Sequence, residues 1–266
     1  MNEQKSNWFP FGVNTNKGEV PPQQQVFCFY YAGGSASVFK PWLNISKENS
    51  YIPIELPGRG IRIVEPCCTD MQEIVNVLIK KLLAVISTPF IFFGHSLGAA
   101  ICFQLAWTMQ ERGLPLPSKI VVAGRHAPHR PDPSRLQSNM SDPEMTAELR
   151  RLNGTPKDIL DNKEMLNFLL PMIRSDLKLH ESFNFSGQHL SIPIIAHCGK
   201  LDDEADEAIM SHWSKVTDSD FQIREFEGDH FFVQSRGQTY FHSLEDTISE
   251  DFSIFSEEEN FEYGTI

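Results

Sequence analysis

Short apolar runs alternate with segments of helical periodicity along most of the chain. Residues 69–88 and 99–113 repeat apolar positions at helical spacing and predict two helices. The apolar runs are rich in β-branched and aromatic residues, and several end at glycine, which is typical of strands. Six strands are predicted in this way, over residues 26–32, 51–56, 90–93, 119–124, 192–199 and 221–228. Their alternation with helical segments predicts an α/β fold with a mostly parallel, doubly wound sheet.

The predicted helices carry local start and stop signals. Thr69 and Gln72 have the form of a capping box before the first helix. Gly113 follows the last apolar position of the second helix and marks its end.

About 65 residues separate the fourth and fifth predicted strands, which is too long for an ordinary crossover. We therefore expect an inserted helical lid over about residues 128–188. Residues 141–154 predict one helix with Ser141 or Asp142 as its cap, and residues 161–183 predict one or two more, interrupted at Pro171. Five apolar residues would form the underside of this lid, facing either the domain or a substrate: Met165, Phe168, Leu169, Met172 and Ile173.

Composition favours one domain. The chain has 266 residues, of which 41% are hydrophobic, as suits a single α/β core. Residues 1–24 are polar and predict a flexible leader, and residues 25–250 form the expected domain. Residues 251–266 predict an acidic, solvated tail.

Charge and apolar run lengths exclude several classes of function. The net charge of -12 disfavours nucleic acid as a partner, because phosphate binding needs a basic face. No apolar run is long enough for a membrane-spanning helix, and no signal peptide is recognisable, so we expect a cytoplasmic protein without a membrane partner. The five cysteines have no metal-ligand spacing, so no metal site is expected.

Residues 94–98, Gly-His-Ser-Leu-Gly, directly follow a predicted strand and precede a predicted helix. A Gly-x-Ser-x-Gly turn in this context is typical of a nucleophile elbow, although a glycine-rich turn without chemistry is the alternative. A serine nucleophile needs a histidine base and a carboxylate that orients it. Asp202 and His230 follow the last two predicted strands, in the order Ser, Asp, His. Asp203 remains a competitor for the acid, and His95 is expected to be a structural neighbour of the elbow.

Seven motifs, including those around Ser96, Asp202 and His230, give the chain a specific resemblance. It resembles the type II thioesterases, the stand-alone editing hydrolases of nonribosomal peptide and polyketide synthases, over roughly residues 26–245. The similarity rests on CFYYAGGSA (28–36), LPGR (56–59), GHSLGA (94–99), AGRHAP (123–128), LPMIRSDLKLHES (170–182), GKLDD (199–203) and GDHFF (228–232). The family often has proline where Tyr30 and Asp203 stand here, so the loops at these two positions depart from its pattern.

The resemblance implies an α/β-hydrolase fold with a Ser96, Asp202 and His230 triad. The backbone amide of Leu97 is placed by the elbow, and the resemblance implies that the amide of Ala32 is the second oxyanion donor. It also implies a monomer that hydrolyses acyl groups from the phosphopantetheine arm of carrier proteins. No cofactor is expected, because an acyl-enzyme route needs only side chains, backbone amides and water.

Two alternatives stay open from the sequence. One is a medium-chain thioesterase that releases chains from a fatty acid synthase, and the other is a catalytically silent carrier-binding module. The nearly balanced charge of residues 125–178 is compatible with docking of an acidic carrier, and Arg150 and Arg151 are the candidates for that contact.

Overall fold

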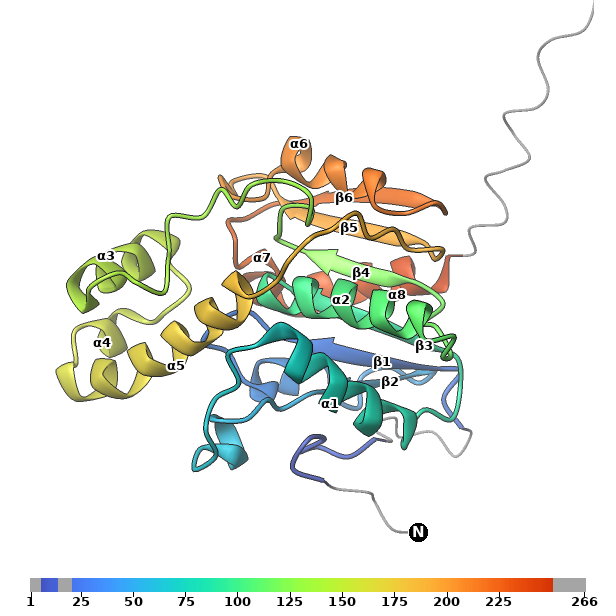
Figure 1. The fold of residues 1–266 in the computed structure, drawn as a ribbon, viewed down its shortest axis with the longest axis horizontal. Helices are drawn as coiled ribbons and strands as arrows, with labels where there is room; N and C mark the ends of the chain where they lie inside the picture. The colour runs from blue at the N-terminus through green and yellow to red at the C-terminus, as the bar shows by residue number, and fades with distance from the viewer. Residues whose placement is uncertain (1–5, 14–20, 251–266) are drawn as a thin grey trace, which may run out of the picture.

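A six-stranded parallel sheet forms the centre of the molecule. The computed structural model describes residues 6–13 and 21–250 (Figure 1). The strand order is β2-β1-β3-β4-β5-β6, and every neighbouring pair is parallel. The strands are β1 (Gln24–Phe29), β2 (Asn49–Pro53), β3 (Phe90–His95), β4 (Ile120–Ala123), β5 (Ile194–Gly199) and β6 (Phe221–Phe226). The predicted parallel, doubly wound sheet is confirmed.

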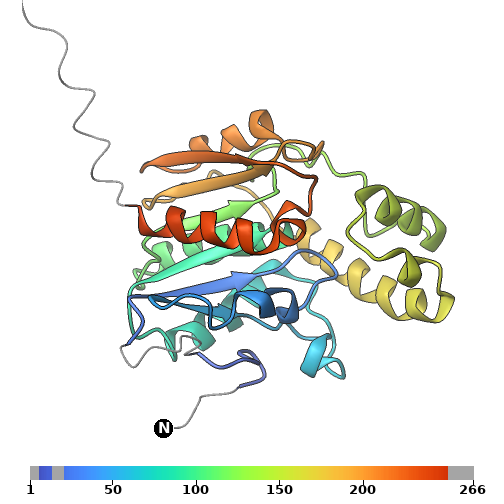
Figure 2. The same ribbon diagram turned by 180° about the vertical axis from the view of Figure 1, so that it is seen from behind.

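Helices cover both faces of this sheet. Helices α1 (Met71–Leu83) and α2 (Leu97–Glu111) lie on the face seen in Figure 1, and α8 (Gly237–Ser249) lies on the opposite face in Figure 2. All residues of β3, β4 and β5 are buried as a result, which explains their nearly continuous apolar sequences. The shorter helices are α6 (Glu207–Met210), α7 (Phe232–Ser235) and three 3₁₀ segments, Ala36–Trp42, Gly60–Arg62 and Ser211–Lys215.

Helix α1 begins one residue later than the predicted capping box requires. Its N-cap is Asp70, whose carboxylate accepts the backbone amide of Glu73 at 2.7 Å. The capping box of Thr69 and Gln72 is therefore wrong, because the aspartate satisfies the free amide of the first turn directly.

Three helices lie between β4 and β5 in the chain and project beyond one end of the sheet (Figure 1). They are α3 (Asp142–Leu152), α4 (Lys157–Leu160) and α5 (Lys163–Glu181), which we call the lid. Ser141 caps α3 in a capping box with Glu144. The lid has an apolar cluster separate from the main core, formed by Leu136, Met145, Leu149, Leu160, Leu170, Ile173 and Leu177.

Two details of α5 differ from the sequence prediction. The helix runs through Pro171 without interruption, so a single helix replaces the predicted break. Met165 is 50% exposed and Phe168 is 63% exposed, so these two residues do not belong to the apolar underside. The buried face of α5 instead follows Leu170, Ile173 and Leu177, because these residues pack into the lid cluster.

Part of the predicted flexible leader packs on the domain. Trp8 and Phe9 are buried, and the carbonyl of Trp8 accepts the backbone amide of Glu55 at 3.0 Å. The guanidinium of Arg62 lies 3.8 Å from the centre of the Trp8 ring. These contacts hold residues 6–13 against the domain. The other parts of the predicted leader up to residue 20, which are residues 1–5 and 14–20, lie outside the described residues, as does the predicted acidic tail. Within the described part of the chain, no helix is long and apolar enough to cross a membrane.

Candidate active site

Ser96 occupies a strained turn between β3 and α2. Its backbone has φ 54° and ψ -112°, and its amide donates to the carbonyl of Ala123 at 2.8 Å. The flanking glycines make this turn possible. A Cβ atom on Gly94 would lie 2.3 Å from the backbone of Gly98, and one on Gly98 would lie 2.2 Å from the carbonyl oxygen of Phe29. Only glycine fits at either position, so the turn has the backbone geometry that is typical of a nucleophile elbow.

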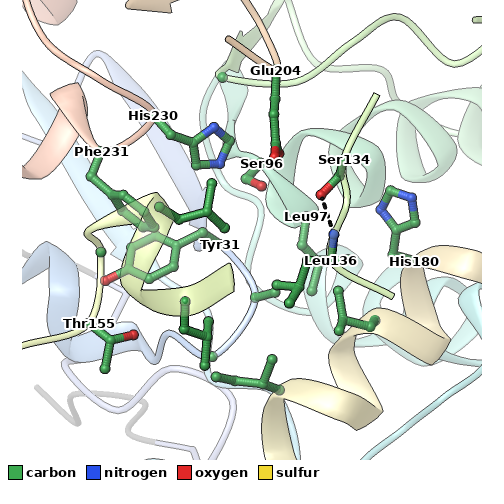
Figure 3. Close-up of a pocket in the computed structure, with 18 of the residues that line it drawn as sticks. Tyr31, Ser96, Leu97, Ser134, Leu136, Thr155, His180, Glu204, His230 and Phe231 are labelled. Atoms are coloured by element: carbon green, nitrogen blue, oxygen red, sulfur yellow. Dashed lines mark hydrogen bonds between the residues drawn. The ribbon is translucent and has the colours of Figure 1, made fainter. Parts of the chain in front are cut away.

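Two loops at the carboxyl ends of β5 and β6 bring Asp202 and His230 together. The Nδ1–H of His230 donates to Oδ2 of Asp202 at 2.9 Å, and Oδ1 of Asp202 accepts the amide of Glu204 at 3.0 Å. The side chain of Asp202 is 1% exposed. In Figure 3 the imidazole of His230 faces the Ser96 side chain, and both residues line one cavity. The donation from Nδ1 leaves Nε2 of the neutral ring as an acceptor.

The charges of this pair shift both pKa values. Burial lowers the pKa of His230, but the hydrogen bond and charge of Asp202 outweigh it, so the net pKa lies above the ordinary 6.5. Burial raises the pKa of Asp202, and the hydrogen bond from His230 outweighs it, so the net pKa lies below the ordinary 3.8. The carboxylate is therefore ionised at neutral pH and favours a proton on the histidine.

His95 holds the backbone of His230. Its Nε2–H donates to the carbonyl of His230 at 2.8 Å, because a carbonyl can only accept. Burial, together with the nearby His230, lowers the pKa of His95 to about 3, so the ring is neutral. Its Nδ1 atom has no hydrogen-bond partner among the described residues. His95 is thus a structural neighbour of the elbow, as expected.

Asp203, the alternative acid, points to a different partner. Its carboxylate is 69% exposed and forms an ion pair with Arg151 of α3 at 3.1 Å. The contact with His230 comes from Asp202.

Ala32 and Leu97 both line the cavity that contains Ser96. Leu97 is the first residue of α2, and Ala32 lies in a turn closed by a hydrogen bond from the amide of Gly34 to the carbonyl of Tyr31 at 2.9 Å. Within the described residues, neither the Leu97 nor the Ala32 amide donates to a protein acceptor. The first amides of a helix have no partner inside the helix and favour negative charge.

The cavity has a volume of about 220 Å³ and reaches from Ser96 to the lid (Figure 3). Its lid side is apolar and is formed by Leu136, Leu149, Leu152, Ile159, Leu169, Ile173 and Leu177. Tyr31 and Phe231 pack edge to face beside His230, with ring centres 5.0 Å apart. A ligand that extends from Ser96 toward the lid would therefore contact mainly hydrocarbon on the lid side.

A second wall of the cavity is polar, and sequence reasoning gave its residues no role. Arg125 donates to Nδ1 of His180 at 2.7 Å, and Nε2 of His180 lies 2.8 Å from Asp132. Burial lowers the pKa of Arg125 to about 10. Arg125 and His180 stand in the AGRHAP and LPMIRSDLKLHES segments, which were the only sequence signal for this wall. Among the described residues, no cluster of three or more His, Cys, Asp or Glu side chains could hold a metal ion.

Comparison with known proteins identifies the family. Residues 24–248 match the thioesterase domain family. The chain belongs to the thioesterase family. It is 36% identical over 248 residues to "Linear gramicidin dehydrogenase LgrE" of Brevibacillus parabrevis, covering 91% of this chain and 93% of that protein. It is also 36% identical to "Gramicidin S biosynthesis protein GrsT" of Aneurinibacillus migulanus, covering 86% and 89% of the two chains.

Solved structures support the same assignment for this thioesterase. The type II thioesterase BorB from the borrelidin biosynthetic cluster superimposes with a TM-score of 0.79 at 29% identity, covering 92% of this chain and 99% of that chain. The predicted α/β-hydrolase fold and the resemblance to type II thioesterases are both confirmed.

Proposed function

We propose that this thioesterase hydrolyses acyl groups from the phosphopantetheine arm of carrier proteins, and so clears misprimed or stalled modules of nonribosomal peptide or polyketide synthases. The observation that carries the proposal is that Ser96 and His230 line one cavity with an apolar lid side, while the buried Asp202 accepts a hydrogen bond from His230. The similarity to GrsT and to BorB supports the choice of a carrier-bound substrate.

In the acylation step, Ser96 Oγ attacks the thioester carbonyl while Nε2 of His230 accepts the hydroxyl proton. Asp202 holds the ring in the required tautomer and stabilises the imidazolium that forms. The amides of Ala32 and Leu97 stabilise the negative oxygen of the tetrahedral intermediate. The C–S bond then breaks, and the proton on His230 passes to the leaving thiolate.

In the deacylation step, His230 takes a proton from water, and the resulting hydroxide attacks the acyl-serine ester. The tetrahedral intermediate uses the same two amides. Collapse breaks the ester bond, the proton returns to Ser96, and the carboxylic acid leaves. Side chains, backbone amides and water suffice for the cycle.

The apolar lid side of the cavity also favours a second candidate, a medium-chain thioesterase that acts on a fatty acid synthase. The two functions use the same triad and differ in acyl preference and partner. A series of acyl lengths on the same carrier distinguishes them, because only the second predicts a strong preference for medium chains.

The test is the intact mass of an acetylated carrier protein over time, with the wild-type enzyme, with Ser96→Ala and without enzyme. We expect loss of the acetyl mass only with the wild-type protein. Removing the nucleophile should reduce kcat by about 10⁶-fold, so no loss of the acetyl mass beyond the blank should be detected over the same time. No loss beyond the blank across several acyl lengths, with folded protein, would reject the proposal.

A further inference from the structure

A buried ion pair joins the lid helix α5 to the loop after β2. Asp176 of α5 is completely buried, and Arg59 is 2% exposed. The pair is bidentate, with Nη1 and Nη2 of Arg59 each 2.6 Å from a carboxylate oxygen. Burying two charges is costly, and such a pair is weak support for stability alone. Its position therefore calls for another explanation.

The same carboxylate contacts the turn that contains Ala32. Oδ2 of Asp176 accepts the amide of Gly33 at 2.7 Å, and Nη1 of Arg59 lies 3.4 Å from the carbonyl of Gly34. Gly33 has φ +82°, as the third residue of a type II turn requires. Both charged side chains thus bind the backbone of one turn.

The hydrogen bonds of this turn leave one amide for a ligand. The Gly34 amide donates to Tyr31, and the Gly33 amide donates to Asp176. The Ala32 amide donates to no acceptor in the described residues, and Ala32 lines the cavity with Ser96. Asp176 therefore holds the turn by the amide next to the proposed oxyanion donor.

A second residue of α5 packs against the same turn. Ile173 lies one helical turn before Asp176, and a Cβ atom on Gly33 would lie 2.8 Å from its Cγ1. Figure 1 shows α5 running from the lid toward the sheet, with its later residues nearest the sheet. The turn is thus shaped by the lid helix as well as by the end of β1.

We propose that Asp176 and Arg59 are positioning residues that hold the oxyanion turn in its working geometry from the lid helix. Asp176 binds the Gly33 amide, and Arg59 balances its buried charge. This inference rests on the proposed function, because it assigns the source of the geometry of the Ala32 amide.

Two double variants separate this role from a role in stability alone. Asp176→Asn with Arg59→Gln removes both charges and keeps an oxygen at position 176 that can accept the Gly33 amide. Asp176→Leu with Arg59→Met also removes both charges and has similar side-chain volumes, but it leaves no acceptor. Neither variant leaves Asp176 or Arg59 as an unpaired buried charge, and both remove the positive charge of Arg59 from near the buried Glu55. A comparison of the two therefore tests the polar contacts with the turn, at the Gly33 amide and the Gly34 carbonyl, apart from the loss of charge.

We expect the Leu/Met variant to lose roughly 100-fold in kcat on the acetylated carrier, with KM changed less than about threefold. The Asn/Gln variant should keep kcat within about tenfold of wild type. Thermal unfolding of both variants serves as the stability control. Equal kcat in the two variants, or a loss confined to KM or to the melting temperature, would overturn the inference.

The experiment must also separate this inference from the proposed function. p-Nitrophenyl acetate is assayed in parallel, because its hydrolysis needs the same oxyanion donors without a carrier. If the wild type cleaves only this ester, carrier editing fails and the comparison of kcat still tests the inference. Hydrogen exchange of residues 30–36 gives a readout independent of activity, and faster exchange in the Leu/Met variant alone is expected. Equal exchange in the two variants would contradict the inference.

Discussion

At the residue scale, His230 is held at two points by two buried side chains. Asp202 accepts its Nδ1–H, and His95 donates to its backbone carbonyl. The first contact sets the tautomer, and the second sets the position of the loop. A proton-transfer group needs both, because its acceptor nitrogen must lie within hydrogen-bond reach of the nucleophile.

The raised pKa of His230 predicts the acid side of the pH profile. The proposed base must be neutral, so kcat/KM should rise with pH through a midpoint above the ordinary histidine value of 6.5. Asp202→Asn removes the charge that raises this pKa, and the midpoint should move to lower pH. The same change favours the wrong tautomer and should lower kcat by roughly 10⁴-fold.

Measurement of kcat/KM from pH 5 to 9 checks this prediction. Asp203→Asn is the matched control, because Asp203 is exposed and pairs with Arg151. A midpoint that Asp202→Asn leaves in place, or an equal loss of kcat in the control, would contradict the assigned acid.

At the element scale, the lid helices attach to the domain in different ways. Helix α5 is fixed by buried or half-buried contacts at Asp176 and His180, and by Ser182 directly after its last residue. The loop after β5 that contains Asp202 is called the acid loop. Helix α3 contacts this loop mainly through Arg151, which pairs with Asp203 and Glu204. The amide of Glu204 in turn donates to Asp202, so this ion pair connects the lid to the proposed catalytic acid.

These contacts change the expectation for carrier docking. Arg150 pairs with Asp161 inside the lid, and Arg151 pairs with the acid loop. Both charges already have partners in the chain, so charge reversal at either position would disturb the lid as well as any docking surface. The carrier contact at these two arginines stays a prediction.

We expect Arg151→Ala to lower kcat/KM on the acetylated carrier by about fivefold. The variant removes the ion-pair partner of the acid loop, and a partly exposed ion-pair network contributes about 1 kcal/mol. Arg150→Ala is the control, and its kcat/KM should stay within about twofold of wild type, since its contacts remain within the lid. Steady-state kinetics of the two variants provide the measurement. Equal losses would show that the contact with the acid loop has no special role.

At the scale of the whole molecule, two apolar clusters are separate. The main core surrounds the sheet, and the lid packs around its own smaller cluster. The buried residues of α3 and α4 belong to the lid cluster and none belongs to the main core, so we expect these two helices to open without unfolding of the sheet.

Native-state hydrogen exchange should resolve this difference. We expect the amides of α3 and α4 to exchange at a lower opening free energy than those of β3 and β4. The second half of α5 should be more protected than α3 and α4, because Asp176 accepts the amide of Gly33. Helix α2 serves as the control, because it is covered by the domain. Exchange of α3 only through global unfolding would contradict a separately opening lid.

The sequence by itself determined the elements and the local chemistry. The apolar runs indicated β3, β4 and β5 because strands covered on both faces must be apolar throughout. The edge strand β6 is mostly half-buried, and its sequence mixes apolar with charged residues. The glycines around Ser96 indicated the elbow because a side chain at Gly94 or Gly98 would collide with backbone. The order of Ser96, Asp202 and His230 supplied the candidates because each follows a predicted strand.

Only the tertiary structure decided which distant groups meet. Sequence spacing did not reveal that Asp176 contacts Gly33 and Arg59, or that His95 contacts the carbonyl of His230. It also misplaced Met165 and Phe168, because a helix with apolar residues on several sides gives no unique buried face. These contacts depend on how a lid of three helices packs against the ends of the strands, and local periodicity contains no information about that packing.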